Sequence, residues 1–491
     1  MIQLLFTPTL AIFLILNMLL ALSIIFLERK DPSATWAWLM VALFLPFLGF
    51  VLYLWIGAET KKRNAFIQKS RMDLDCFNAY AETAFYADNI RDTLDKYSDS
   101  ELIFSDSAWS NFNGLAFLNF AAGLGFLCHN NEVDIFHDGN SKFERMFADI
   151  ELAEEFIHLE YYIMRDDELG RRLVALLTRK ASEGVEVRFL IDCMGKPFKY
   201  KTMFAELIKA SGEVCVFLPR YIVRLNYRNH RKICVIDGKI GYIGGVNIGR
   251  EYLGNTTRYG NWRDAHIRIY GDCAKELNLR FIMDWNYAWD NGKHISLDSK
   301  YFPKIADSDG VRMQIISSGP DTRWPVIRDS YLKMITAAKR SVYIQTPYFV
   351  PDDSIFEALK IAALSGVDVK IMIPAYPDHL FVFPAALSYL DVLVSAGVSA
   401  YKYHAGFVHS KVMLIDGLVS SVGTANIDIR SFKLNFEINA FIYDEAKTSE
   451  LEQQFLRDID ECVLMDKAFF ENRGRWSKVK EAVSRLLSPL L

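Results

Sequence analysis

The sequence of 491 residues has no excess of positive charge and no cysteine pairs at metal-binding spacing. It contains 56 lysines and arginines against 60 aspartates and glutamates, so the formal net charge is −4. This balance argues against DNA or RNA as the main partner, because such proteins usually carry a basic excess. The seven cysteines include no Cys-x-x-Cys pair, which indicates reduced thiols and no structural zinc. We therefore expect neither a metal nor another cofactor.

Charged side chains are also absent from two long stretches near the N-terminus, residues 2–27 and 32–58. Each can cross a hydrocarbon core, which needs about 20 helical residues. We expect residues 1–57 to form a transmembrane hairpin of two helices in the cell membrane. A cleaved signal peptide is the alternative, but no basic residue precedes the first run and no Ala-x-Ala site follows it. The basic residues after the hairpin predict a cytoplasmic globular part: Lys61, Lys62, Arg63, Lys69 and Arg71.

The pattern His-x-Lys-x-x-x-x-Asp occurs twice in this chain. One copy contains His230, Lys232 and Asp237, and the other contains His409, Lys411 and Asp416. Both copies lie in apolar segments that predict a buried strand ending at an Asp-Gly turn. Residues i and i+2 share one face of a strand, so each histidine points the same way as its lysine. An imidazole beside an ammonium is a sensible pair when an anion such as phosphate lies between them.

Small residues and an asparagine follow each copy at the same distance. The first copy is followed by Gly244-Gly-Val-Asn247 and the second by Gly423-Thr-Ala-Asn426, and each glycine comes 14 residues after its histidine. Small residues let backbone N–H groups approach an anion, and the asparagine amide adds a neutral donor. The alternative is that these residues only make turns. The matched spacing favours phosphate binding by Asn247 and Asn426.

The duplication extends upstream and predicts whole domains. Two strand-like segments flank a helix-like stretch, residues 168–182 in the first half and 354–365 in the second. Strand, helix and strand in this order predict a βαβ unit in an α/β fold. We expect a juxtamembrane linker region over 58–130, a first lobe over 131–298 and a second lobe over 299–491. The two motifs would then face each other across one shared cleft.

With these features the chain resembles bacterial cardiolipin synthases of the phospholipase D superfamily, whose signature is the duplicated motif. The resemblance covers nearly the whole chain and includes the segments Trp262-Arg-Asp264, Thr346-Pro-Tyr-Phe-Val-Pro-Asp352 and Asn435-Phe-Glu437. It implies two phospholipase D-like lobes. It also implies a phosphatidyl transferase that joins two phosphatidylglycerol molecules into cardiolipin and releases glycerol. Phospholipase D hydrolysis is the alternative, and another phosphodiesterase or nuclease of the superfamily is a further one.

The implied chemistry divides the transfer into two displacements through a phosphohistidine. One histidine attacks phosphorus while the other donates a proton to the leaving oxygen and later accepts one from the incoming hydroxyl. Spacing does not decide between them; the resemblance favours His230 as the nucleophile and His409 as the acid and base. Lys232 and Lys411, with the two asparagines, would hold the non-bridging oxygens. The partners expected are phosphatidylglycerol and anionic membrane lipid, with the oligomeric state left open.

Each histidine also needs a carboxylate on its other nitrogen. Glu437 lies 28 residues after His409 and matches the acid of the superfamily, so we expect it to orient His409. The same count from His230 reaches Arg258, so we nominate Asp264 for the first half, against a plain structural salt bridge. The motif aspartates Asp237 and Asp416 are included with the catalytic set, although orienting the loops suits them better than proton exchange.

The C-terminus is expected to form an amphipathic helix. Its apolar residues recur at three- and four-residue steps: Trp476, Val479, Val483, Leu486 and Leu487. Its basic residues suit an interface with anionic headgroups: Arg473, Arg475, Lys478, Lys480 and Arg485. The alternative is that the apolar stripe packs on the second lobe and the basic residues face solvent.

Overall fold

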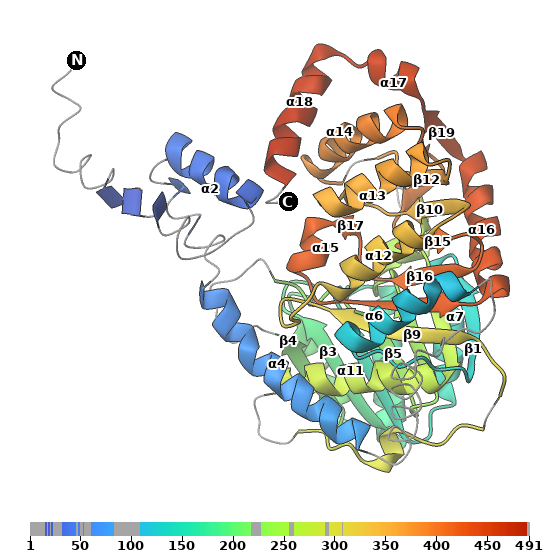
Figure 1. Ribbon diagram of the computed structural model, residues 1–491. Coiled ribbons are helices and arrows are strands. Elements are labelled where there is room, and N and C mark those ends of the chain that lie inside the picture. Colours follow the sequence, from blue (N-terminus) through green and yellow to red (C-terminus); the bar gives the residue numbers. More distant parts are fainter. Residues whose placement is uncertain are drawn as a thin grey trace.

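Figure 1 shows the chain as a computed structural model with two α/β lobes and additional N-terminal and C-terminal helices. The parts of the chain that the structure describes are residues 15–16, 18–19, 21–22, 32–45, 48–49, 53, 60–82, 109–217, 227–254, 260–289, 294–306, 308–376 and 378–488.

The first lobe contains a seven-stranded sheet with the order β1-β8-β6-β5-β2-β3-β4. Strands β2, β3 and β4 are parallel neighbours, as the predicted βαβ unit requires. Helix α8 has the bounds predicted from the sequence. The elements are β1 (Asn131–Phe136), α7 (Gly139–Glu151), β2 (Phe156–Tyr161), α8 (Glu168–Ser182), β3 (Glu186–Asp192), α9 (Tyr200–Met203), α10 (Ala205–Lys209), β4 (Glu213–Phe217), β5 (Lys232–Ile236), β6 (Ile240–Gly244), β7 (Asn261–Arg263), β8 (His266–Gly271) and α11 (Asp272–Ala288).

The second lobe contains an eight-stranded sheet with the order β19-β13-β12-β10-β15-β16-β18-β9. Its elements are β9 (Arg312–Ser318), α12 (Val326–Ala337), β10 (Ser341–Gln345), β11 (Phe349–Val350), α13 (Asp353–Leu364), β12 (Asp368–Pro374), α14 (Val382–Ser395), β13 (Ser399–Tyr403), β14 (Gly406–Val408), β15 (Val412–Ile415), β16 (Val419–Gly423), β17 (Ile427–Asp428), α15 (Ile429–Lys433), β18 (Glu437–Tyr443), α16 (Glu445–Asp460), β19 (Cys462–Met465), α17 (Lys467–Glu471) and α18 (Arg475–Leu487).

The two sheets have the same strand order once β19 is set aside. Read from β4, the first sheet runs β4-β3-β2-β5-β6-β8-β1, and the second runs β13-β12-β10-β15-β16-β18-β9. The two motif strands, β5 and β15, therefore occupy the same place in their sheets. The lobes share one core around α11, in which Trp285 belongs to the same buried cluster as Val422 and Ile438 of the second lobe. The predicted internal repeat is thus a repeat of topology, with an extra edge strand in the second half.

In the described parts of residues 58–130, which we expected to form a linker region, two helices pack on the lobes. Helix α4 (Thr60–Ala81) lies along α11 of the first lobe (Figure 1). Helix α6 (Asn113–Gly123) packs on α12 and β9 of the second lobe. Its buried side chain Leu115 joins the second-lobe core.

The predicted hairpin lies mostly outside the described residues. Helix α2 (Pro32–Phe44) falls within its second half and has 13 residues. In the described ranges, no helix is both long enough and apolar enough to cross a membrane. That residues 1–57 cross the membrane twice therefore remains a proposal.

The C-terminal helix α18 packs on α14, at the outer edge of the second lobe (Figure 1). Its buried side chains are polar: Glu481, Ser484 and Ser488, the last within 3.0 Å of the Tyr389 hydroxyl. The apolar side chains that the structure describes in this helix point outward: Trp476 is 80 % exposed and Leu486 is 76 % exposed. The alternative in which the apolar stripe packs on the lobe is therefore wrong for these residues.

Candidate active site

The two motif histidines are each held by a backbone hydrogen bond to the opposite lobe. The N–H of His230 donates to the carbonyl of Phe436 over 2.9 Å, and the N–H of His409 donates to the carbonyl of Arg263 over 2.7 Å. Strand β7 pairs with β14 in parallel, and Asn229 forms a matching parallel bridge with Phe436. Both histidines are buried. The two copies of the motif thus meet where the lobes join.

Each histidine ring is paired with a carboxylate from the other lobe. Nδ1 of His230 lies 2.9 Å from Glu437, and Nδ1 of His409 lies 2.7 Å from Asp264. Both acids nominated from the sequence lie beside a motif histidine, but each lies beside the histidine of the other lobe rather than the one expected. The cause is that the backbone N–H of each histidine bonds to the residue that precedes the acid of the other lobe.

The structure also corrects the position that is equivalent to Glu437. Phe436 and Arg263, which accept the two histidine amides, immediately precede Glu437 and Asp264. Gly245 donates to Ala265 as Thr424 donates to Ile438, so the residues after the acids correspond as well. Asp264 is therefore the counterpart of Glu437, although it lies 34 residues after its own motif histidine rather than 28. A longer segment before β7 accounts for the different count.

The lysines belong to the same cluster of charges. Lys232 donates to the carbonyl of His230 over 2.6 Å, and Lys411 donates to the carbonyl of His409. Burial lowers the pKa of Lys232 to about 7, and the charge of Lys411 adds to this effect. Burial likewise lowers the pKa of Lys411 to about 8.

The pKa values of the two histidines and of their two acids are all lowered, but for different reasons. Burial lowers the pKa of His409 to about 4, with a further contribution from Lys411. Burial also lowers the pKa of His230, against the opposing charge of Glu437. Burial alone would raise the pKa of Glu437, but His230 and Lys232 outweigh it and hold that pKa below its usual range. The same balance with His409 and Lys411 lowers the pKa of Asp264. A buried site that disfavours four positive charges is suited to an anion.

The motif aspartates lie away from this cluster, at the far ends of β5 and β15. Asp237 accepts hydrogen bonds from the backbone N–H groups of residues 154–156, and Asp416 accepts from those of residues 339–341. Both adopt a left-handed backbone conformation, with φ of 50° and 55°. Their inclusion in the catalytic set is therefore corrected: they anchor the chain that enters β2 and β10.

The two asparagines differ in their contacts. Oδ1 of Asn247 accepts from the N–H of Ile163, and its Nδ2 donates to the hydroxyl of Tyr252 over 3.0 Å. Oδ1 of Asn426 is buried and has no hydrogen-bond partner among the described residues. Asn247 is thus committed to holding neighbouring chain, which reduces its capacity for a phosphate oxygen. The side chain of Asn426 makes no hydrogen bond to the described residues, so its Nδ2 donor is the better candidate for a phosphate oxygen.

Sequence reasoning missed a buried cluster of charges behind the first motif. Arg231, between the motif histidine and lysine, donates to Asp284 over 2.6 Å. Lys69 of α4 lies 2.9 Å from Asp284 and 2.7 Å from both Asp73 and Asp321. The cluster joins α4, the first lobe and the second lobe. No sequence pattern would have found it, because a lysine on a polar helix is usually solvated.

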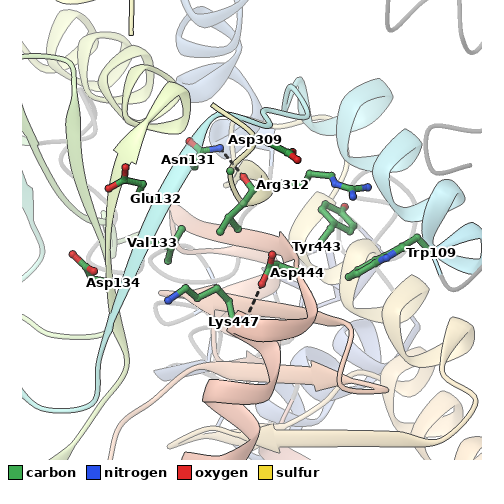
Figure 2. A pocket seen from close by; sticks show the side chains of 12 residues that line it. Trp109, Asn131, Glu132, Val133, Asp134, Asp309, Arg312, Tyr443, Asp444 and Lys447 are labelled. Atoms are coloured by element: carbon green, nitrogen blue, oxygen red, sulfur yellow. Dashed lines mark hydrogen bonds between the residues drawn. The ribbon is translucent and has the colours of Figure 1, made fainter. Parts of the chain in front are cut away.

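A surface cavity of about 530 Å³ lies elsewhere, between the edge strands of the two lobes (Figure 2). None of the motif residues lines it. Glu132, Asp134 and Asp444 face it together with Arg312 and Lys447, so its charges are mixed. It is not part of the histidine cluster. Across the described part of the chain, no group of three or more histidine, cysteine, aspartate or glutamate side chains is arranged to hold a metal ion.

Comparisons with known proteins agree with this geometry. The family described as "Cardiolipin synthase, PLD-like domain" matches residues 146–285 and 331–459, and "Phospholipase_D-nuclease N-terminal" matches residues 15–57. The chain is 45 % identical over 486 residues to a cardiolipin synthase of Listeria innocua, covering 98 % of each chain. It is 44 % identical over 490 residues to the major cardiolipin synthase ClsA of Bacillus subtilis, again covering 98 % of each.

A solved structure supports the fold. The phosphatidylserine synthase of Haemophilus influenzae aligns with a TM-score of 0.56 at 14 % identity, covering 73 % of this chain and 95 % of that one. At this identity the likeness concerns the fold alone. The full-length relatives and the duplicated match carry the assignment further: the chain belongs to the cardiolipin synthase family with two phospholipase D-like domains.

Proposed function

We propose that this protein is a membrane phosphatidyl transferase that makes cardiolipin and glycerol from two molecules of phosphatidylglycerol. The relatives that match over 98 % of their length are named cardiolipin synthases. The observation that carries the proposal is the cluster of two histidines and two lysines, each histidine backed by a carboxylate. An anionic phosphodiester between the histidines would compensate the repulsion of these groups.

The first displacement uses the nitrogen that the carboxylate leaves available. Because Nδ1 of His230 faces Glu437, its Nε2 carries the lone pair that attacks phosphorus. The N–P bond forms as the bond from phosphorus to the glycerol oxygen breaks. His409 donates a proton to that oxygen, and Asp264 stabilises the imidazolium that donates it. The resemblance to the superfamily selects His230 for attack.

The second displacement reverses these roles. His409 removes the proton from the primary hydroxyl of a second phosphatidylglycerol, whose oxygen attacks phosphorus as the N–P bond breaks. His230 is regenerated and cardiolipin is released. Throughout, Lys232 and Lys411 hold the non-bridging oxygens, and an anion beside them favours their protonated forms. Asn426 would add a neutral contact.

Product analysis separates transfer from hydrolysis. Purified full-length protein is incubated with phosphatidylglycerol labelled in its headgroup and acyl chains, and lipids are separated by thin-layer chromatography. Transfer predicts labelled cardiolipin and one free glycerol for each cardiolipin. Phosphatidic acid as the sole phospholipid product would instead identify a phospholipase D.

Trapping the intermediate tests the assignment of the nucleophile. His409→Ala removes the acid of the first step and the base of the second, so a phosphatidyl group that forms is discharged slowly. With excess phosphatidylglycerol it should be found on the peptide that contains His230. Digestion at alkaline pH, which preserves phosphohistidine, followed by mass spectrometry identifies that peptide. An adduct on the peptide containing His409, in a His230→Ala protein, would reverse the assignment.

The family assignment and its N-terminal match support association with a membrane. We place the two apolar stretches as a hairpin and the lobes in the cytoplasm, on the strength of the basic residues at 61–71. A reporter fused at the turn (residues 28–31) should lie on the side of the membrane opposite the cytoplasm. A reporter fused at the C-terminus should lie in the cytoplasm. A cytoplasmic turn would contradict two spans.

A further inference from the structure

Two loops at equivalent places in the lobes carry the most exposed apolar side chains beside the histidine cluster. The first, which we call rim loop 1, comprises residues 193–199 after β3. The second, rim loop 2, includes Tyr376, Leu380 and Phe381 after β12. Strands β3 and β12 occupy the same position in their sheets, so the two loops are related by the repeat.

Rim loop 1 begins directly behind the first motif. Asp192, the last residue of β3, accepts the backbone N–H of Asn229, the neighbour of His230, over 2.8 Å. Its other oxygen accepts the N–H of Met194, which turns the chain into the loop. From this support Phe198 projects with 99 % of its surface exposed, and Met194 is 53 % exposed. A ring that is this exposed buries almost no apolar surface in the folded lobe.

Rim loop 2 is held close to the second motif. Asp378 of this loop accepts a hydrogen bond from Tyr348, and its charge opposes the lowering of the Lys411 pKa. The neighbouring ring of His379 lies 5.4 Å from Tyr348. Leu380 is 88 % exposed, with Tyr376 and Phe381 about half exposed. Both lobes therefore present apolar side chains on a loop that hydrogen bonds hold next to their own motif.

Charge at rim loop 1 suits an anionic surface. Lys199 and Lys201 are exposed on either side of Tyr200, and Lys196 lies over the Tyr200 ring at 5.2 Å. Basic residues beside exposed aromatic rings are typical of segments at the headgroup level of a membrane. Isolated exposed leucines occur on most proteins, but paired loops around one site are a different arrangement.

We propose that the two rim loops insert into a bilayer containing anionic lipid, so that the histidine cluster opens onto the membrane surface. This inference rests on the proposed function, because it explains how a substrate with two acyl chains delivers its headgroup to buried histidines. The chains remain in the bilayer between Phe198 and Leu380, and only the phosphodiester moves into the site.

Activity on two physical forms of the substrate tests the proposal. The full-length protein is assayed with phosphatidylglycerol in bilayers and with a short-chain phosphatidylglycerol below its micelle concentration. Phe198→Ser with Leu380→Ser should lower the ratio of bilayer to monomer activity roughly tenfold, since two apolar side chains no longer enter the lipid. The matched control is Leu152→Ser with Leu364→Ser. Leu152 and Leu364 are 77 % and 67 % exposed and lie at the opposite ends of the sheets. The control should keep the wild-type ratio.

Photo-crosslinking gives a second readout that does not require turnover. A benzophenone amino acid at position 198 or 380, in full-length protein reconstituted with radiolabelled lipid, should form lipid adducts, and the same residue at 152 or 364 should not. Equal adducts at all four positions, or an unchanged activity ratio in the double variant, would overturn the proposal. Adducts at 198 and 380 without cardiolipin from either substrate would support the rim loops while contradicting the proposed function.

Discussion

Glu437 of the second lobe lies 2.9 Å from Nδ1 of His230 in the first lobe, and Asp264 and His409 repeat this relationship in the opposite direction. Each carboxylate is fully buried and each holds one imidazole nitrogen. A carboxylate in this position selects the tautomer that leaves Nε2 available, and it stabilises the protonated ring when the histidine acts as an acid.

The crossed pairs predict paired effects of amide substitutions. Glu437→Gln should impair attack by His230, and Asp264→Asn should impair proton transfer by His409. Each should lower kcat by roughly 10²- to 10⁴-fold, the range seen when such an acid is replaced behind a histidine. Rates with short-chain phosphatidylglycerol and thermal unfolding measure the two properties separately. A loss of activity that only follows a loss of folded protein would mark these residues as structural.

The lysines predict an alkaline limb in the pH dependence. With pKa values of about 7 and 8, Lys232 and Lys411 lose their protons as pH rises, and kcat/KM should fall through this range. Because a bound anion favours the protonated amines, the limb in kcat should lie at higher pH. The acid limb should lie below pH 6.5, since burial lowers the pKa of His230. A kcat/KM that stays constant up to pH 10 would contradict this assignment.

The lowered pKa of Lys232 also predicts that this residue favours activity at the expense of folding stability. Its folded pKa of about 7 lies below the unfolded value, so the unfolded chain binds this proton more tightly. The resulting penalty is full below pH 7 and disappears as pH rises toward about 10. Lys232→Met should therefore raise Tm at pH 7 by roughly a few degrees. It should also cost about 3–4 kcal/mol of transition-state stabilisation.

In the wild-type protein, the same account predicts activity that survives EDTA, because the two lysines supply the positive charge. Loss of activity on chelation, with recovery on adding magnesium, would show that this account is wrong. The matched control for Lys232→Met is Lys333→Met, which replaces an exposed lysine of α12 outside the cluster. Lys333→Met should change neither Tm nor the rate.

Lys69 predicts that α4 is part of the folded lobes. Its ammonium is fully buried among Asp73, Asp284 and Asp321. Lys69→Met leaves these carboxylates without that partner, and removal of one member of a buried ion cluster costs about 3–5 kcal/mol. Thermal unfolding of the full-length protein should show the loss, and Lys478→Met, on the exposed face of α18, should show none. Equal Tm values for the two variants would contradict the role of the cluster.

The outward face of α18 predicts contact with lipid. Trp476 is 80 % exposed, and Lys480 and Arg485 are exposed on the same helix. Fluorescence of wild-type protein minus that of Trp476→Phe reports this one indole in proteoliposomes. Brominated lipid should quench the difference signal when anionic lipid is present. An unquenched difference signal would place this face in water.

The sequence predicted the two lobes because the repeat is long and both motifs lie in buried strands. From the sequence, Glu437 and Asp264 were both nominated as the carboxylate partners of a histidine, but each was assigned to the wrong histidine. Their contacts cross between the lobes, so no periodic pattern in the sequence reveals them. The count from His230 to Asp264 is further obscured by the longer segment before β7. The sequence also did not predict that the polar face of α18 packs on the second lobe, because an apolar stripe does not identify the surface that it contacts.

The backbone bridges between the lobes have a consequence for how lipids come and go. Strand β7 is paired with β14, Asn229 is bridged to Phe436, and both histidine–acid pairs cross the same boundary. A rigid-body opening of the two lobes would break these contacts and separate the two histidines. We therefore expect both substrates to enter and cardiolipin to leave while these contacts between the lobes stay intact.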